Sequence, residues 1–438
     1  MSRSTEGAES LFLRELFERM NANSLHYSVL RNYECLPEGT GGSDLDIAVL
    51  HSDRERIASV VRTAALKYGG ETIVDYEGSG HFLRILGVSN HEWWGVAIDL
   101  FDSIEYRGVE YVSCEKIINR SKSHGAIRVA DDGDALIVAL VKELLSNGRS
   151  RKGYLEDAST LWQQRGKECL DVLSESIDSN TLECLGKTLE SSGGSLEDLV
   201  TSLRKAVLSK GSTWHRAYNL WKRFRRLWKT PGVAVAVLGT DGAGKTTVIA
   251  AIKPTVEQAL HSRIEYEHLR PNWIPRLGRV AGKSEPIEKI DNPHAQKPSG
   301  FLGSVARLIY YAVDYYVGYW RKVHLRLAKG PCLVLFDRYY YDFIMDPKRM
   351  RIALPQWLIK LTMMVAPQPQ LILCLGAEPE VIYARKPETS LEEVTRQVET
   401  LKKMCKDNDR AVWIDTGICV KKSCDTALRA IQRTMMCK

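Results

Sequence analysis

The sequence lacks the features that would place a protein in a membrane or outside the cell. No stretch approaches the roughly 18 consecutive apolar residues that a membrane-spanning helix requires, and the N-terminus shows no basic-then-apolar signal-peptide pattern. The ten cysteines are scattered, and no C-x-x-C pair occurs among them. Isolated cysteines argue against a zinc site and are typical of a reducing compartment. We therefore expect a cytoplasmic protein.

The charge is only weakly biased toward one sign. A formal net charge of +7 over 438 residues favours anionic ligands or surfaces without requiring nucleic acid, so we expect no nucleic-acid partner. Hydrophobic residues make up 44% and charged residues 26% of the chain, as in ordinary globular proteins. The length predicts two or three domains.

A phosphate-binding pattern lies near the middle of the chain. After the apolar run 233–238, GTDGAGKTT at 239–247 fits G-x-x-x-x-G-K-[ST] and leads into a helix pattern. In such a loop successive backbone N–H groups surround phosphate oxygens, and the N-terminus of the following helix adds its dipole. Lys245 would contact the β- and γ-phosphates of ATP, and the Thr246 hydroxyl would hold Mg²⁺. The predicted nucleotide-binding residues are Gly239, Gly242, Ala243, Gly244, Lys245, Thr246 and Thr247.

Residues 233–438 alternate strand and helix patterns. Apolar runs near 331–336, 371–375 and 411–415 predict strands, and 301–328 predicts a long helix. This alternation indicates a parallel sheet with helices on both faces and a ligand crevice at the carboxyl ends of the strands. Lys245 and the pair Asp337-Arg338 both fall at that edge. Residues 272–302, rich in Pro, Gly and Lys, predict a long loop.

These pieces together resemble thymidylate kinase and its relatives across nearly all of residues 233–438. The matching segments are GTDGAGKTT at 239–247, HLRP at 268–271, FDRYYYD at 336–342 and a lid-like ARKPE at 384–388. The resemblance implies an ATP- and Mg²⁺-dependent kinase, a reaction in which cationic clamps and a metal supply most of the catalysis. Carried over by position, it implies Arg270 and Arg338 on the acceptor's phosphate, Asp241 on an acceptor hydroxyl, Asp337 near Mg²⁺ and the attacking oxygen, and Arg385 on the transferring phosphoryl group.

One position departs from that family. Its members carry an aromatic side chain that stacks on the base and, four residues later, an arginine that reads it; here Tyr311 keeps the aromatic, but Tyr315 replaces the arginine. A site without that hydrogen-bonding residue loses discrimination. We therefore expect a different phosphorylated or hydroxylated small-molecule acceptor, a nucleotide or a sugar, bound by Arg270, Tyr311 and Arg338. The fusion to a second domain resembles thymidylate-kinase-like proteins of bacterial surface-polysaccharide synthesis.

Acidic residues mark the N-terminal region. In a strand pattern that follows a Gly-rich turn, Asp44 and Asp46 share one face, with apolar residues on the other. Asp99 is a lone acid in the apolar strand pattern 95–101, which is costly unless the carboxylate is paired or binds a metal. Three carboxylates so placed suit a divalent metal bound with a triphosphate.

This constellation resembles the polymerase-β-like nucleotidyltransferases over about residues 20–165. In that superfamily a Gly-Ser pair opens a helix well before the first Asp. Here Gly42-Ser43 directly precedes Asp44, and Arg31-Asn32 occupies the upstream position. Three interpretations stay open: catalytic nucleotidyl transfer, a non-catalytic domain for substrate recognition, and an acid-rich loop without metal.

A basic aromatic stretch, residues 211–232, joins the two regions. Trp214, Tyr218, Trp221 and Trp228 share one helical stripe among Arg and Lys residues, and the following Pro-Gly ends the helix. Residues 214–229 allow two interpretations: a helix whose aromatics pack on a domain, or a peripheral contact with an anionic membrane surface.

The predicted organisation has three parts: a nucleotidyltransferase-like α+β domain with a helical extension at 1–210, a linker helix at 211–232, and a thymidylate-kinase-like α/β P-loop domain at 233–438. Three functions compete: a kinase, a nucleotidyltransferase whose P-loop domain is regulatory, and a P-loop switch that performs no acceptor chemistry. An acceptor-side arginine pair and an arginine-bearing lid favour the kinase. The oligomeric state is open, and a homodimer is compatible with the sequence.

Overall fold

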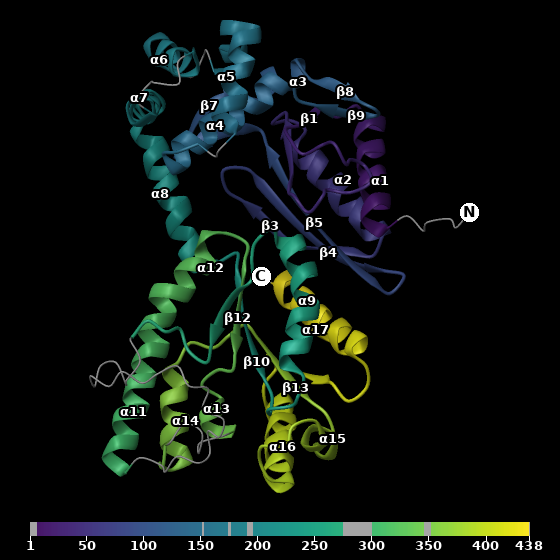
Figure 1. Cartoon of the computed structure of the whole chain (residues 1–438), viewed down its shortest axis with the longest axis vertical. Helices are drawn as coiled ribbons and strands as arrows, with labels where there is room; N and C mark the ends of the chain where they lie inside the picture. The colour runs from purple at the N-terminus through teal and green to yellow at the C-terminus, as the bar shows by residue number, and fades with distance from the viewer. Residues whose placement is uncertain are drawn as a thin grey trace. The chain divides into compact units, whose positions relative to one another are not determined.

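The computed structural model describes residues 7–150, 153–173, 177–190, 196–274, 300–345 and 352–437. The chain divides into two units, Met1–Arg225 and Arg226–Lys438, which are drawn in Figure 1 and described here one at a time. Within the described ranges, no helix is both long enough and apolar enough to cross a membrane. Most of the loop expected at 272–302 lies outside the described residues.

The N-terminal unit is built on a seven-stranded mixed sheet with the order β3-β4-β5-β2-β1-β9-β8. β2 and β5 run parallel, whereas β3, β4 and β5 form an antiparallel meander that the sequence analysis did not anticipate. The strands of the unit, including the separate pair β6–β7, are β1 (Tyr27–Val29), β2 (Leu45–Val49), β3 (Gly70–Glu77), β4 (His81–Ser89), β5 (Glu92–Phe101), β6 (Ser103–Tyr106), β7 (Val109–Ser113), β8 (Lys122–His124) and β9 (Ile127–Val129).

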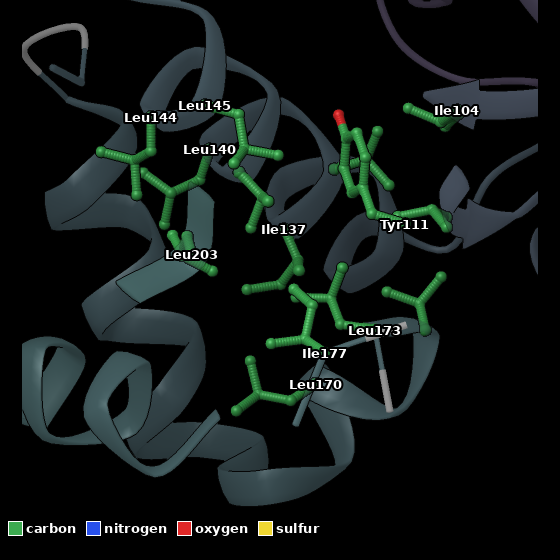
Figure 2. Packing of buried hydrophobic residues seen from close by; sticks show 14 of the residues in the cluster. Ile104, Tyr111, Ile137, Leu140, Leu144, Leu145, Leu170, Leu173, Ile177 and Leu203 are labelled. Atoms are coloured by element: carbon green, nitrogen blue, oxygen red, sulfur yellow. The ribbon is translucent and has the colours of Figure 1, made fainter. Parts of the chain in front are cut away.

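The helices of this unit form two groups. They are α1 (Ala8–Ala22), α2 (Arg54–Lys67), α3 (Cys114–Asn119), α4 (Asp132–Asn147), α5 (Tyr154–Arg165), the 3-10 helix η1 (Gly166–Leu173), α6 (Ser179–Glu190), α7 (Leu196–Ser209) and α8 (Thr213–Trp228), which runs into the second unit. α1 and α2 bury their apolar faces in one core, and α4 to α7 contribute to another. Figure 2 shows the second core, where side chains of α4, η1 and α7 gather with Tyr111 of β7.

The two cores lie on opposite faces of the sheet because successive strand residues point to opposite sides. Ile47 of β2 belongs to the core of α1 and α2, and its neighbour Ala48 belongs to the core of α4. Asp46, two residues before Ala48, therefore shares the face covered by α4. By the same alternation Asp99 shares that face with Phe101. The sheet thus presents both acids to one layer of helices.

The C-terminal unit contains a five-stranded sheet, parallel throughout, with the order β11-β12-β10-β13-β14. Figure 1 shows α9 and α17 on one side of the strands and α11, α12 and α14 on the other, so the expected parallel sheet with helices on both faces is confirmed. The strands are β10 (Val233–Leu238), β11 (Glu265–His268), β12 (Leu333–Asp337), β13 (Leu371–Gly376) and β14 (Ala411–Asp415). The helices are α9 (Lys245–Leu260), α11 (Phe301–Val313), α12 (Leu325–Lys329), α13 (Asp342–Met345), α14 (Gln356–Val365), α15 (Pro379–Arg385), α16 (Leu391–Asp407) and α17 (Val420–Met436).

The long helix expected at 301–328 is present but changes its winding. Between α11 and α12 the chain forms a π-helical segment, η3 (Asp314–His324), a winding that is rare and is often found at functional sites. Asp314, its first residue, is fully buried. The Asp314 carboxylate accepts hydrogen bonds from the backbone N–H groups of Trp273 and Ile274, at 2.9 and 2.7 Å. The segment thus fixes the chain that follows β11.

Candidate functional site

The phosphate-binding loop emerges from the centre of the C-terminal sheet. β10 is buried along its whole length and pairs with β12 and β13. Gly242 and Gly244 have φ angles of 87° and 82°, a left-handed conformation that glycine adopts without strain. α9 begins at Lys245, so the first backbone N–H groups of this helix have no intrahelical acceptor and are suited to an anion.

The loop lines a cavity of about 540 Å³. The residues predicted from sequence that line it are Asp241, Gly242, Gly244, Lys245, Thr246, Thr247, Asp337, Arg338 and Arg385. Others on its wall had been given no role in the sequence analysis, among them His268 at the end of β11 and Lys386 after α15. The cavity therefore lies at the carboxyl ends of β11, β12 and β10, where parallel sheets of this type bind ligands.

Lys245 lies folded over the loop. Its Nζ donates to the carbonyl oxygens of Gly239 and Thr240, at 2.9 and 3.0 Å, and is 3.9 Å from the Asp241 carboxylate. Burial and the nearby positive charge of Arg338 lower the pKa of Lys245 to about 8. A phosphate in the cavity would favour the charged ammonium form and raise that pKa again.

Arg338 connects two acids. It follows β12 with a φ of 72°, and only 7% of the residue is exposed. Its Nη1 donates to Oδ2 of Asp342 at 2.9 Å, and its Nη2 donates to Asp241 of the loop. Burial disfavours the guanidinium charge, but Asp342 and Asp241 together raise the pKa of Arg338. Asp342 ends the FDRYYYD segment at 336–342, but its pairing with Arg338 could be identified only from the structure.

Asp337 is held as an anion. Oδ2 accepts a hydrogen bond of 2.5 Å from the Tyr266 hydroxyl and is 3.6 Å from His268 Nδ1. Burial acts to raise the pKa of Asp337, but His268, Tyr266 and the charge of Lys245 lower it to about 2. Its other oxygen, Oδ1, is buried and has no hydrogen-bond partner among the described residues. An orphaned carboxylate oxygen in the same cavity as the Thr246 hydroxyl fits Mg²⁺, which prefers oxygen ligands.

Two cations stand at the rim of the cavity. Arg385 ends α15, and its Nη2 donates to the carbonyl oxygen of Thr416 at 3.0 Å. Lys386 forms an ion pair of 2.9 Å with Glu388. Both residues are exposed, so neither has to leave a buried partner to contact an anion in the cavity.

Two of the three residues expected to bind the acceptor, Arg270 and Tyr311, do not line this cavity. Arg270 is buried, and its Nη1 donates to Oδ2 of Asp314 at 2.9 Å. The Tyr311 ring lies 5.0 Å from that of Phe343, centroid to centroid, in the apolar core. Tyr315, at the position of the family's base-reading arginine, is itself in the core. Contacts of Arg270 and Tyr311 with an acceptor therefore stay predictions.

In the N-terminal unit the structure brings Asp44, Asp46 and Asp99 together. Asp46 lies opposite Asp99 in the parallel pairing of β2 with β5, and one carboxylate oxygen from each of the three acids lies within 4.8 Å of the other two. Burial raises the pKa of both Asp46 and Asp99. Asp46 and Asp99 also line a cavity of about 280 Å³.

Two arginines that the sequence analysis had not connected with the acids enter this cluster. Arg31 Nε donates to Oδ2 of Asp46 at 2.5 Å, and Arg31 Nη2 is 3.6 Å from Oδ1 of Asp44. Arg84, on β4, donates from Nη1 to Oδ1 of Asp99 at 2.6 Å. The only sequence signal was the presence of Arg31 where the resembled superfamily has its Gly-Ser pair.

Helix α8 occupies residues 213–228 of the predicted linker. Along it, basic side chains lie over aromatic rings: Lys222 Nζ is 4.5 Å from the Tyr218 ring centroid, and the Arg225 guanidinium is 5.5 Å from that of Trp221. Lys222 also donates to the carbonyl oxygen of Gly78 at 3.1 Å. The side chain of Trp214 lies outside the described residues, and a membrane contact through 214–229 stays a prediction.

Comparisons with known proteins give limited information. No protein-family model matches the chain. Over 236 residues, the chain is 22% identical to the "uncharacterized ATP-binding protein YghS" of Escherichia coli (strain K12), a match that covers 47% of this chain and 95% of that protein. A crystal structure of thymidylate kinase from Ehrlichia chaffeensis matches with a TM-score of 0.32 and 12% identity, covering 46% of this chain and 98% of the other. A TM-score of this size does not establish a shared fold.

Proposed function

We propose that the Arg226–Lys438 unit is an ATP- and Mg²⁺-dependent kinase for a small phosphorylated or hydroxylated acceptor. The observation that carries the proposal is that Arg338, Arg385 and Asp337, all outside the loop, line the same cavity as the triphosphate-binding loop. Nucleotide binding requires only the loop, whereas phosphoryl transfer also requires cations around a second anion and around the transferring group. The description of the Escherichia coli relative as ATP-binding supports ATP as the donor.

On the donor side, the loop N–H groups and the start of α9 would hold the phosphates of ATP. Lys245 would exchange its bonds to the carbonyl oxygens of Gly239 and Thr240 for the β- and γ-phosphates. This exchange is favourable because burial lowers the pKa of Lys245 to about 8, and the nearest carboxylate, that of Asp241, lies at 3.9 Å, beyond hydrogen-bond distance. Arg385, exposed at the rim, would contact the γ-phosphoryl group as it transfers.

Thr246 and Asp337 would hold Mg²⁺ through the hydroxyl and the orphaned Oδ1. Bound there, Mg²⁺ supplies neutralisation of the negative charge on the phosphoryl oxygens. A carboxyl with a pKa of about 2 is a weak proton acceptor at neutral pH. Asp337 therefore acts as a charged ligand and hydrogen-bond acceptor in this proposal, and not as a general base.

On the acceptor side, Arg338 is the residue best placed to bind a phosphate. Its guanidinium bridges Asp241 and Asp342. An acceptor phosphate would displace Asp241, the more exposed of the two acids, while Asp342 keeps the guanidinium in position. Asp241, displaced from the guanidinium, would then accept a hydrogen bond from an acceptor hydroxyl. A nucleotide and a sugar of surface-polysaccharide synthesis are the acceptor classes to test.

The test is a screen of nucleoside monophosphates and sugar phosphates for conversion of ATP to ADP by the full-length chain, with the phosphorylated product identified by mass spectrometry. Lys245→Ala should abolish product formation. Lys253→Ala, an exposed lysine of the same helix outside the cavity, is the matched control and should keep it. Acceptor phosphorylation that survives Lys245→Ala would refute the kinase assignment.

The alternatives give different products in the same assay. A P-loop switch would release phosphate from ATP with no phosphorylated acceptor in any reaction. A nucleotidyltransferase would release pyrophosphate, and that release would be lost on changing Asp44 and Asp46 together to Asn while Lys245→Ala left the chemistry intact.

A further inference from the structure

The acid cluster of the N-terminal unit, Asp44, Asp46 and Asp99, already contains cations supplied by the chain. The Arg31 guanidinium reaches both Asp46 and Asp44, with N–O distances of 2.5 and 3.6 Å. These are two of the three carboxylates whose oxygens lie close enough together to hold a metal ion. Arg31 therefore places a positive charge against one oxygen of Asp46 and near one oxygen of Asp44, beside the position that a divalent cation would take between these acids.

The third carboxylate, that of Asp99, is also paired with an arginine. Arg84 pairs with Asp99 at 2.6 Å, and its Nη1 also lies within hydrogen-bond distance of the carbonyl oxygens of Leu83 and Ile98, at 3.0 and 3.3 Å. Arg84 is only 5% exposed. Withdrawing this guanidinium would leave Asp99 as a buried charge without its cation, which is strongly unfavourable.

The charges in the cluster are nearly balanced before any ion enters. Two guanidinium groups face three carboxylates, and Lys142 lines the same cavity as Asp46 and Asp99. Arginine does not lose its proton in proteins, so a rise in pH does not release these carboxylates from their guanidinium groups. A divalent ion coordinated at 2.0–2.6 Å would stand next to the Arg31 guanidinium and be repelled by it. The residues therefore do not fit the metal that the nucleotidyltransferase resemblance implies.

We propose that Arg31 takes the place of a divalent metal ion in the acid cluster, so that the N-terminal unit binds neither Mg²⁺ nor Mn²⁺ between Asp44, Asp46 and Asp99. This unit then does not catalyse metal-dependent nucleotidyl transfer. Its cavity of about 280 Å³ instead serves to recognise a ligand. Oδ1 of Asp46, buried without a hydrogen-bond partner among the described residues, is one acceptor available to such a ligand. This inference does not depend on the kinase proposal.

The experiment is a Mn²⁺ titration without nucleotide, followed by the electron paramagnetic resonance of free Mn²⁺. Every sample is the full-length chain carrying Thr246→Ala, which removes one of the two expected metal ligands of the kinase site and keeps any binding there constant across the variants. With Arg31 present, Asp46→Asn should leave Mn²⁺ binding unchanged. Arg31→Gln should create a new Mn²⁺ site, on the order of a hundredfold tighter than residual binding, since a repelling charge is removed and the carboxylates are freed.

Two further variants establish what creates the new site. Arg31→Lys keeps a cation at the cluster and should not bind Mn²⁺. Adding Asp46→Asn to Arg31→Gln should abolish the gained site. Far-UV circular dichroism checks that each variant is folded. If Arg31→Gln does not fold, the proposal is still tested by comparing Mn²⁺ binding of the two chains that keep Arg31, one with Asp46 and one with Asp46→Asn. Mn²⁺ binding that disappears on Asp46→Asn overturns the proposal, and binding that is equal in the two chains supports it.

Discussion

The ion pair between Arg338 and Asp342 offers the sharpest test of the candidate site. Arg338 is the residue proposed to bind the acceptor's phosphate, and the same buried pair is expected to stabilise the fold. We consider Arg338→Gln, Asp342→Asn and the double variant. Arg338 and Asp342 are 9% and 1% exposed at their side chains, and the N–O distance between them is 2.9 Å. Arg338→Gln removes the charge but keeps a polar side chain, and it leaves Asp342 as a buried carboxylate without its cation.

The expected magnitude follows from the burial of the pair. Two unit charges about 4 Å apart attract by roughly 4 kcal/mol at an effective dielectric constant of about 20, and removing one partner of a buried pair typically costs about 3–5 kcal/mol. Arg338→Gln should therefore lower the free energy of unfolding by about 3–5 kcal/mol. Asp342→Asn should cost less, because Asp241 still pairs with the guanidinium. The double variant should lose less unfolding free energy than the sum of the two single-variant losses, by about 1 kcal/mol or more.

The assay is equilibrium unfolding in urea of the full-length chain, fitted with separate transitions for its two units because a two-unit chain need not unfold in one step. Lys253→Gln is the control: this lysine is exposed on α9 and lies 3.9 Å from Glu257, so its loss should leave the urea midpoint unchanged. Strictly additive effects of the two substitutions at Arg338 and Asp342 would refute the pairing, and with it the view that Asp342 positions Arg338 for an acceptor phosphate.

Three further predictions concern single side chains of the same unit. Asp337 has a pKa of about 2 against 3.8 in the unfolded chain. Its ionised form therefore adds about 2 kcal/mol of stability above pH 4 that is lost as the pH falls toward 2. Asp337→Asn should destabilise the protein at pH 7 but progressively less toward pH 2 in urea unfolding, and a pH-independent loss would contradict the assigned pKa. Lys245 should be acylated by acetic anhydride with a titration midpoint near pH 8, which moves upward when MgATP is added; a midpoint near 10.5 without nucleotide would show that burial does not act on its ammonium. Arg270→Ala should lower the free energy of unfolding by about 3–5 kcal/mol, because it leaves the fully buried Asp314 carboxylate without its cation. A variant with unchanged stability in urea unfolding but reduced affinity for the acceptor would contradict this structural role and support acceptor binding by Arg270.

The sequence by itself determined the local features of this protein. The glycines and Lys245 identify the phosphate-binding loop, because a loop can turn its backbone N–H groups toward one phosphate only if some of its residues adopt a positive φ, and Gly242 and Gly244 do so. Alternating strand and helix patterns likewise predict the parallel sheet, since a parallel connection requires a crossover helix. The strand pattern that contains Asp46 predicts the face that its carboxylate occupies.

Only the tertiary structure decided which charges meet. Asp342 follows Arg338 by four residues, but Asp241 is 97 residues from it, and Asp314 is 44 residues from Arg270. The meander β3-β4-β5 brings Arg84 to Asp99, and the turn after β1 brings Arg31 to Asp46. The periodicity of a segment reports which of its side chains are buried, but not which strand will lie beside it. The partner of a buried charge depends on that pairing, and for this reason the sequence could suggest a metal site where the fold supplies an arginine.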